Sequence, residues 1–380
     1  MLIELHLIQN FAPSNLNRDD TGNPKDAEFG GVRRARISSQ AFKRAIRLHP
    51  VFARTTEIEP AVRTRLIVRR LNGKLQAAGK NEEEARAVAV AMAEAYAGKA
   101  GKMDGNRTRV LLYLSKEEIE SLAAGLLENW DAALQAAQNS KDKKAQENAP
   151  FTSLVKDLIK ATKNRTSAPD IALFGRMLAD KPEINLDAAC QVAHAISTHR
   201  VSMDLDFFTA VDDLQRDEES GAGMMGTTAF NSACFYRYIA IDWEQLVQNL
   251  DGDHTLARKT VEGFLRAALQ AIPSGKQNAF AAQNPPDFVL AVRNAARAPR
   301  SLANAFEKPV RPNREGGLVE PSIQALDAYW ASLAAIYGQD GLEPAALSLR
   351  PAAAFSNLQG AAKANLEDWL QSVLQGLGEE

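Results

Sequence analysis

The chain has 380 residues, of which 45% are hydrophobic and 24% charged, and its formal net charge is −2. This composition is that of an ordinary globular protein, long enough for two average domains or for one domain with large insertions. Its two cysteines, Cys190 and Cys234, exclude a disulfide framework and an all-cysteine zinc site. The sequence shows neither a signal-peptide pattern nor an apolar run of roughly 20 residues, so we expect a cytoplasmic protein without a membrane partner.

The chain should begin with a strand, because residues 2–9 alternate apolar and polar side chains. Residues 10–28 are rich in Asn, Asp, Pro and Gly, which predicts a loop. A cationic segment overlaps the end of this loop: residues 25–47 hold seven Lys and Arg against two acids. Gly30 and Gly31 can adopt positive φ or approach a ligand closely. A cationic island in a slightly acidic protein favours an anionic partner.

A helix should follow, beginning at about Gln40 with Ser38 or Ser39 as its N-cap. One face of this helix is polar and mostly cationic, and its residues are Gln40, Lys43, Arg44 and Arg47. An apolar stripe lies opposite, so the helix can pack on a core while it presents charge and free N–H groups. That combination suits phosphate oxygens, and the alternative is a merely solvated basic face.

The next hundred residues are rich in Ala, Glu, Lys and Arg and almost without strand patterns, which predicts a helical insertion. Helical patterns occur near residues 60–78, 81–99, 115–138 and 150–161, with an exposed joint at Lys141–Lys144. A second basic patch in the insertion, which includes Arg63 and Arg69, is interpreted as a solvated helix face.

Residues 169–177 alternate like a strand, and the Ala-rich residues 187–197 predict a short helix that contains His194. His194 and His199 lie five residues apart, which does not fit a helical metal pair, so we expect no metal site. Two alternating stretches, 201–214 and 227–239, flank a charged, Gly-rich tip and predict a long β-hairpin.

The C-terminal part predicts an amphipathic helix at 255–272, a strand at 287–293 and two closing helices at 320–337 and 361–376. A small polar loop between the first helix and the strand contains Lys276, Gln277 and Asn278. The order of strands and helices fits an α+β fold with a ferredoxin-like or RRM-like βαββαβ core and two large insertions. The predicted division places the core at 1–50, 166–197 and 227–380, the helical insertion at 51–165 and the hairpin at 198–226.

Several segments together resemble CasC, the backbone subunit of the type I-E CRISPR Cascade complex. The signature stretch is Phe29-Gly30-Gly31, Arg33-Arg34, Arg36-Ile37-Ser38-Ser39-Gln40 and Lys43-Arg44. Matching segments follow in the family's order at residues 16–20, 175–177, 193–199, 208–214, 235–238 and 303–308. Residues 50–165 carry the least resemblance.

The resemblance implies a palm formed by the core, fingers formed by the helical insertion and a thumb formed by the hairpin. It implies a non-catalytic protein without a cofactor that polymerises head-to-tail along CRISPR RNA, with target DNA and other Cascade subunits as further partners. Met177 would wedge between bases, and Phe207 or Phe208 would help displace a nucleotide, unless those two aromatics are buried in the root of the hairpin. The expected RNA-binding residues are Arg18, Lys25, Gly30, Gly31, Arg33, Arg34, Arg36, Ser38, Gln40, Lys43, Arg44, Arg47, Arg176, Met177, Phe207, Phe208, Lys276, Gln277 and Asn278.

An enzyme is the rival hypothesis, because Asp19, Asp20 and Asp26 lie in the first loop near the basic residues. Backbone subunits of the related type III complexes use an acidic loop residue to cut RNA with a divalent metal. The simpler interpretation is that Asp19 or Asp20 orients Arg18 or Arg36 through an ion pair. The sequence contains no phosphate-binding Walker motif, no Gly-x-Ser-x-Gly elbow and no zinc-ligand set.

Overall fold

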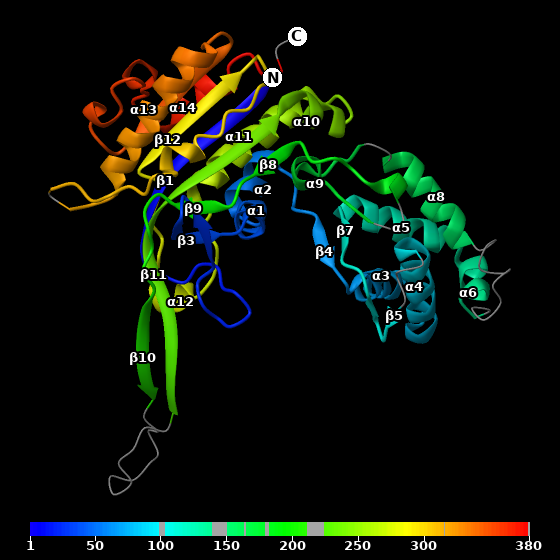
Figure 1. The fold of residues 1–380 in the computed structure, drawn as a ribbon. Coiled ribbons are helices and arrows are strands. Elements are labelled where there is room, and N and C mark those ends of the chain that lie inside the picture. Colours follow the sequence, from blue (N-terminus) through cyan, green and yellow to red (C-terminus); the bar gives the residue numbers. More distant parts are fainter. Residues whose placement is uncertain are drawn as a thin grey trace, which may run out of the picture. The chain divides into compact units, whose positions relative to one another are not determined.

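The computed structural model (Figure 1) describes residues 1–98, 103–138, 150–162, 165–178, 182–210, 224–314 and 316–378. The chain has an α+β fold and divides into two compact units. Unit 1 consists of Met1–Thr55, Cys190–Trp243 and Val261–Glu380, and unit 2 consists of Thr56–Ala189 and Glu244–Thr260. Among the helices that the structure describes, none combines the length and the apolarity needed to cross a membrane.

Unit 1 is built on a nine-stranded sheet in which every pair of neighbouring strands is antiparallel. The strand order is β13-β12-β1-β11-β9-β3-β2, and β10 and β8 also pair with β11. The strands are β1 Leu2–Ser14, β2 Asp26–Phe29, β3 Val32–Ile37, β8 Cys190–Val192, β9 Ala195–Ser197, β10 Asp204–Ala210, β11 Met224–Asp242, β12 Phe288–Asn294 and β13 Leu342–Ser348. The strand predicted at 2–9 is therefore confirmed as the first part of β1.

Helices cover both faces of this sheet, so β1 is buried on both sides. On one face, Ile8 of β1 packs in a cluster with Phe288 of β12 and Ile323 of α13 (Val319–Tyr337). On the other face, Phe11 of β1 packs in a second cluster with Phe42 of α1 (Ser39–Arg47). The apolar stripe of α1 packs the helix onto the core, as the sequence predicts, and the polar stripe lies outside except at Arg47, which is buried.

The remaining helices outside the insertion are short, apart from one long helix, and α10 and the first part of α11 are assigned to unit 2. They are α2 Pro50–Thr56, α10 Trp243–Asn249, α11 His254–Gln270, α12 Gln277–Phe280 and α14 Leu366–Leu374, with single 3-10 turns η3 Ala303–Phe306, η4 Ala352–Phe355 and η5 Gln359–Ala361. The helices expected at 255–272, 320–337 and 361–376 are confirmed, as is the strand expected at 287–293.

Unit 2 is mainly helical and encloses its own core, in which Met92, Leu122 and Leu126 are buried. Its helices are α3 Ile67–Ala77, α4 Glu82–Ala97, α5 Lys116–Glu128, α6 Trp130–Gln138, α8 Pro150–Thr162 and α9 Pro169–Phe174, with the 3-10 turn η2 Pro182–Ile184. Two small ladders complete it: β4 Val62–Thr64 with β7 Leu112–Leu114, and β5 Met103–Asp104 with β6 Arg107–Thr108. The predicted helical insertion is confirmed, although its third helix is two helices, α5 and α6. Lys141–Lys144 lie outside the described residues.

Several sequence predictions are wrong. Residues 10–14 and 26–28, expected in a loop, belong to strands β1 and β2, and the helix expected at 60–78 begins only at Ile67 of α3, after strand β4. Residues 169–174 form helix α9 rather than a strand, with Pro169 at the first helical turn and Asp170 beside it. Residues 190–192 and 195–197 form strands β8 and β9 rather than a helix, because β11 offers them backbone partners such as Ile239 and Tyr236. The division into units also differs from the predicted domains, since residues 166–189 and 244–260 belong to the helical unit.

The predicted hairpin is present in its described part. β10 pairs with the first part of β11 from Asp204 opposite Phe230 to Ala210 opposite Met224. Figure 1 shows this hairpin continuing β11 beyond the other strands of the sheet. Residues 211–223, which contain the predicted tip, lie outside the described residues.

Candidate nucleic-acid interface

Helix α1 presents a short basic face next to a capped N-terminus. Ser38 is the N-cap: its φ is −66° and ψ 147°, and its Oγ accepts a hydrogen bond from the N–H of Ala41 at 3.4 Å. Gln40 and Arg44 are exposed and Lys43 is half-buried, so three of the four predicted stripe residues reach the surface. Arg47 does not, because it is buried at the end of the helix. We therefore remove Arg47 from the predicted phosphate contacts.

Arg34 is also a structural residue rather than a surface cation. It is fully buried, and its guanidinium donates to the backbone carbonyls of Phe29, Ser197, Phe306 and Glu307 at 2.7–3.2 Å. Burial lowers the pKa of Arg34, and the nearby Glu307 carboxylate opposes that shift. A buried guanidinium that is engaged by four carbonyls from three segments cannot also hold a phosphate, which corrects the prediction for Arg34.

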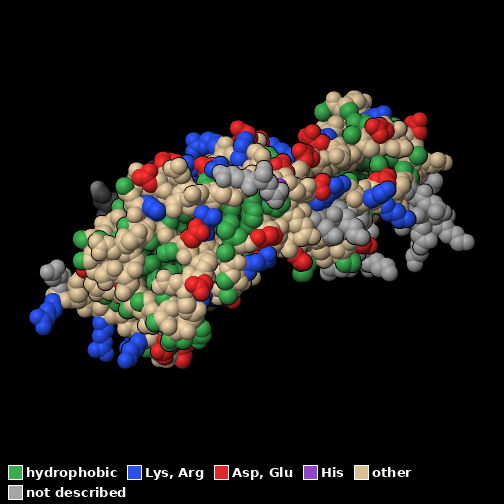
Figure 2. Space-filling view, turned by 90° about the horizontal axis from the view of Figure 1, so that it is seen from above, with side chains coloured by type: hydrophobic (Ala, Val, Ile, Leu, Met, Phe, Trp, Pro, Cys, Tyr) green, Lys and Arg blue, Asp and Glu red, His purple; other side chains and the backbone are tan. Residues whose placement is uncertain are grey.

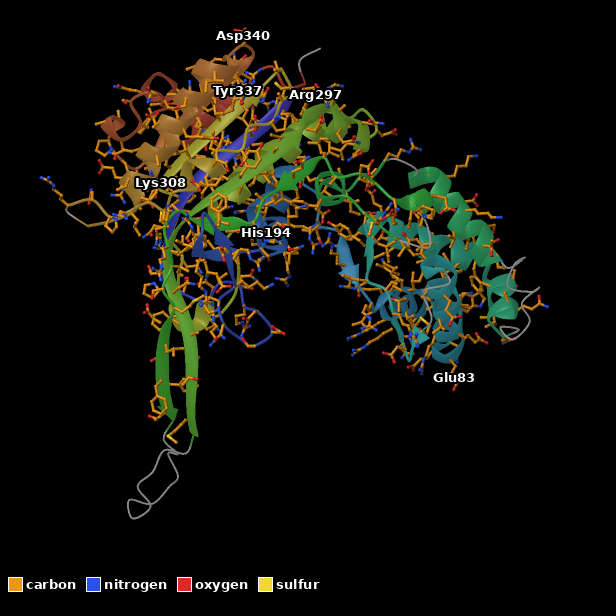
Figure 3. All side chains as sticks on the ribbon, in the orientation of Figure 1. Glu83, His194, Arg297, Lys308, Tyr337 and Asp340 are labelled. Carbon is orange, nitrogen blue, oxygen red and sulfur yellow. The ribbon has the colours of Figure 1, made fainter. Side chains whose placement is uncertain are left out.

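The other two arginines of β3 face outward and are organised by Asp26. Arg33 is exposed and forms an ion pair with the Asp26 carboxylate. Arg36 is half-buried; its Nε donates to the backbone carbonyl of Asp26 at 3.0 Å, and its Nη1 lies 3.0 Å from Nδ1 of His194. The exposed His194 is labelled in Figure 3. The pKa of His194 is lowered by partial burial first and then by the neighbouring Arg36 and Lys25, which favours a neutral ring beside these cations.

The loop acids have different partners from those expected. The Asp19 carboxylate accepts from the backbone N–H groups of Thr21 and Asn23 at 2.9 Å and from Oγ1 of Thr21 at 2.7 Å. These hydrogen bonds, that of the Thr21 hydroxyl foremost, hold the pKa of Asp19 below its usual value. Asp19 thus shapes its own loop, which corrects the expectation that it orients Arg18 or Arg36, whereas the same expectation for Asp20 stays a prediction. Among the described residues, no group of three His, Cys, Asp or Glu side chains is arranged to hold a metal ion.

A hollow of about 690 Å³ lies between α1, the first loop and residues 272–275, all within unit 1. Its lining includes Arg18 from the loop and Arg44 from the helix, together with Asp19 and Asp20. The two loops pack closely here: a Cβ on Gly275 would lie only 2.3 Å from the carbonyl oxygen of Leu16. Arg18 of the first loop therefore lines the same hollow as Arg44 of α1.

The polar loop that follows α11 contributes mainly through Lys276. Its Nζ donates to Oγ1 of Thr228 at 2.8 Å, which ties the loop to β11 near the hairpin. Gln277 donates to the carbonyls of Pro273 and Ala282, so its amide holds the loop together, while Asn278 is exposed. Lys276 and Asn278 remain candidate contacts, and Gln277 is better described as a loop-forming residue.

The two hairpin aromatics are exposed. Phe207 is 63% exposed and Phe208 39% exposed. Successive residues of a strand point to opposite faces, so the two rings lie on different faces of the hairpin. Phe208 lies directly across from Gly226, where a Cβ would lie 2.5 Å from the Phe208 ring. The alternative that both are buried in the hairpin root is therefore excluded.

In unit 2, the adjacent residues Arg176 and Met177 have different environments, one buried and the other exposed. Met177 is 84% exposed, as a side chain that wedges between bases would be. Arg176 is buried, and its Nη1 forms an ion pair with Oε1 of Glu118 at 2.6 Å while its Nε donates to the carbonyl of Ile184. The expectation that Arg176 contacts phosphate is corrected, because this side chain fixes the backbone that presents Met177.

Sequence reasoning missed the surroundings of Met177. It lines a hollow of about 500 Å³ together with Arg63, Leu111 and Tyr113, and the Arg63 guanidinium lies 4.4 Å from the centre of the Tyr113 ring. Leu111 is also exposed. Arg63 was noted only as part of a solvated face, and no local pattern connects it with Met177, which lies over a hundred residues further along the chain.

The fold has close counterparts among solved structures. One, described as a CRISPR RNA-guided surveillance complex, pre-nicking, contains a chain with 33% identity and a TM-score of 0.85, and the match covers 98% of this chain and 99% of that chain. A second, described as a CRISPR RNA-guided surveillance complex, has 29% identity and a TM-score of 0.76 at the same coverage. The fold thus defines an α+β protein of the class found in such complexes.

A family model described as CT1975-like protein matches residues 3–372. The chain therefore belongs to the CT1975-like family, and the resemblance to CasC backbone subunits is confirmed. Among curated proteins, none matches the chain.

Proposed function

We propose that this protein is a non-catalytic CRISPR RNA-binding subunit of a cytoplasmic type I-E Cascade complex. It polymerises head-to-tail along the guide RNA and presents the bases in segments for pairing with target DNA. The observation that carries this proposal is the position of two exposed cations, Arg18 and Arg44, at the hollow beside α1, in a fold that matches a chain of an RNA-guided complex over 98% of its length.

The core of unit 1 supports the proposal. Counting β1, β9, β11 and β12 as the four core strands, their order in the sheet is β12-β1-β11-β9, with all neighbours antiparallel. That is the order expected of the split βαββαβ arrangement, in which the first and third strands are central. Its helical insertion and hairpin correspond to the fingers and thumb that the resemblance implies.

The phosphate grip would consist of the cations that reach the surface. The proposed set is Arg18, Lys25, Arg33, Arg36, Lys43, Arg44 and Lys276, with Gln40, Ser38 and Asn278 as polar neighbours. These side chains can neutralise phosphates without reading base sequence, as a protein that must accept any guide requires. Met177 and the hairpin aromatics would separate the bases, because apolar and aromatic side chains stack on any base.

The positions of the loop acids support a binding role over the rival RNA-cleaving role. Asp19 is engaged by three hydrogen bonds within its own loop, and Asp26 pairs with Arg33. These two carboxylates have local structural uses, and a nucleolytic metal site built on either would require it to change partners. Asp20, the third loop acid, is exposed at the hollow beside α1.

The test is RNA binding across a salt series, comparing wild type with Lys43→Ala/Arg44→Ala. If both side chains contact phosphate, the slope of log affinity against log salt should flatten by about 1.4, since each phosphate of a single strand contributes roughly 0.7. The matched control is Lys156→Ala/Lys160→Ala, two exposed lysines on α8. An unchanged slope in the α1 variant would show that this face is not the grip. Head-to-tail assembly predicts that particle mass rises stepwise with RNA length, and a constant mass would refute it.

A further inference from the structure

His194 lies on the short turn between strands β8 and β9, and its ring is exposed. Its Nδ1 lies 3.0 Å from Nη1 of Arg36 on β3, the strand that pairs with β9. An arginine side chain can only donate hydrogen bonds, so Nδ1 must be the acceptor and carries no proton. The ring is therefore neutral in this structure, and its N–H is at Nε2, the nitrogen that does not face Arg36.

Two cations keep this ring neutral. Partial burial lowers the pKa of His194, and the positive charges of Arg36 and Lys25 lower it further. The two acids of β2 are both directed to Arg33, since Asp26 forms an ion pair with it and Glu28 lies opposite it in the ladder. Figure 2 shows the more usual arrangement, in which Lys and Arg side chains lie among Asp and Glu side chains. A proton on His194 would add a third positive charge beside two others, which costs electrostatic free energy.

The other ionisable groups on the elements around this turn act elsewhere, and they are Arg34 of β3, Arg237 and Tyr238 of β11 and Lys43 of α1. Arg34 and Arg237 are buried and donate to backbone carbonyls, and the Tyr238 hydroxyl donates to Glu4 at 2.6 Å. The charge of Lys43 acts on the buried Cys190 thiol of β8. The charge state of His194 is therefore controlled by Arg36 and Lys25.

A bound phosphate would change this balance. Its oxygens accept hydrogen bonds and carry negative charge, so Arg36 can turn its Nη1 from His194 to the phosphate. Nδ1 can then take a proton from solvent, because the negative charge offsets the repulsion from the two cations. The protonated ring has two N–H donors instead of one, and it places a further positive charge beside the phosphate.

We propose that His194 is a further contact for RNA phosphates, neutral in the free protein and protonated when RNA is bound. The inference rests on the proposed function, in which Lys25 and Arg36 hold guide phosphates, and it adds a residue and a proton to that contact. Proton uptake makes the affinity depend on pH: RNA should bind more tightly as pH falls, by at most about tenfold per pH unit for one proton. A residue that only orients Arg36 would take up no proton.

The test measures proton uptake by calorimetry with the full chain. The heat of RNA binding is determined at about pH 6 in several buffers that differ in ionisation enthalpy, and the slope of heat against ionisation enthalpy is the number of protons taken up. The RNA is a single-stranded oligouridylate without a terminal phosphate, since a phosphate monoester would itself titrate at about pH 6.

The test variant is His194→Asn, whose amide oxygen can accept from Arg36 in place of Nδ1 but which cannot take up a proton. The matched control is His49→Asn. His49 lines the hollow beside α1 together with Arg44, and partial burial and then the charge of Arg54 lower its pKa, so it is the rival site of proton uptake.

Wild type and His49→Asn should take up about 0.3 to 1 proton per bound chain at about pH 6, and His194→Asn should take up less than about 0.1. Lowering the pH from about 7.5 to about 5.5 should also steepen the slope of log affinity against log salt in wild type by up to about 0.7, the contribution of one single-strand phosphate contact. In His194→Asn this slope should be the same at both pH values.

Several results would overturn the proposal. Equal proton uptake by wild type and His194→Asn would place the proton elsewhere, and loss of uptake in His49→Asn alone would place it on His49. RNA binding by wild type without proton uptake would show that His194 stays neutral and only orients Arg36. Wild type that binds no RNA at any pH would refute the guide-binding role and this proposal with it, whereas the other results leave that role standing.

Discussion

Gly30 faces the backbone of Glu307 so closely that a Cβ on residue 30 would lie 1.8 Å from the Glu307 carbonyl oxygen. The same carbonyl accepts a hydrogen bond from the buried Arg34. Two segments that are almost 280 residues apart in sequence therefore pack closely. Gly30 has no Cβ to keep them apart, and the buried guanidinium of Arg34 holds them together by hydrogen bonding. The close backbone approach that the Gly pair predicts is real, but its partner is the protein itself rather than a ligand.

This contact predicts an unequal effect of alanine at the two glycines. Both have positive φ, 62° at Gly30 and 71° at Gly31, so either substitution costs about 1–2 kcal/mol of conformational energy. At Gly31 a Cβ would meet no other atom within 4 Å, whereas at Gly30 backbone must move. We expect Gly30→Ala to lower the free energy of unfolding by at least about 2 kcal/mol more than Gly31→Ala does, as measured by urea denaturation. Equal losses would contradict the contact.

The buried ion pair of unit 2 predicts a second stability difference. Glu118→Gln keeps an amide oxygen for the N-terminus of α5 but leaves the Arg176 guanidinium buried without its charge partner. The expected loss is about 3–5 kcal/mol, the range found when one member of a buried pair is removed. Glu120→Gln on the same helix breaks an exposed pair with Lys74 and should cost less than about 1 kcal/mol. Similar costs for the two variants would show that Arg176 finds another partner.

The parts of the site that could be predicted are local. Ser38 as N-cap, the two stripes of α1 and the positive φ of Gly30 and Gly31 depend on neighbours within about one helical turn. The hairpin was predictable for the same reason, because alternation on both sides of a Gly-rich stretch is a short-range pattern.

The burial of individual cations could not be predicted. Arg33 and Arg34 are adjacent in sequence, yet one is exposed and the other fully buried, because the acceptors of Arg34 lie at Ser197, Phe306 and Glu307. Likewise, strand β9 forms from an Ala-rich stretch because β3 and β11 supply backbone partners on both sides. Arg34 and these acceptors are more than a hundred residues apart in sequence, and so are β9 and its partner β3. No local pattern could therefore show either outcome.

The exposed hairpin aromatics predict a loss of RNA affinity that is independent of charge. Phe207→Ala should weaken RNA binding by about 1–3 kcal/mol, the range for one stacked base, and should leave the salt slope unchanged. Because Phe207 is largely exposed, the free energy of unfolding should change by less than about 0.5 kcal/mol. Tyr337→Ala, which removes an exposed aromatic at the end of α13, is the control and should bind RNA as wild type does. Equal affinities for wild type and Phe207→Ala would exclude this ring from the interface.

The histidine at the centre of the sheet predicts a dependence of stability on pH. His6 is buried on β1, its Nδ1 lies 2.9 Å from the Tyr236 hydroxyl, and burial lowers its pKa to about 3. The unfolded chain binds a proton at this residue below about pH 6.5, while the folded protein stays neutral until about pH 3, so stability falls as pH decreases between these values.

From about pH 7.5 to about pH 5.5, His6 alone should remove about 1.4 kcal/mol from the free energy of unfolding. The measurement is urea denaturation at both pH values for wild type and His6→Gln. The substitution has its own cost at either pH, so the informative quantity is the difference between the two pH values, which should shrink by about 1.4 kcal/mol in the variant. The other histidines are present in both proteins and cancel in that comparison. An unchanged difference would mean that His6 gains a proton in the folded state, which requires the sheet around Tyr236 to admit water.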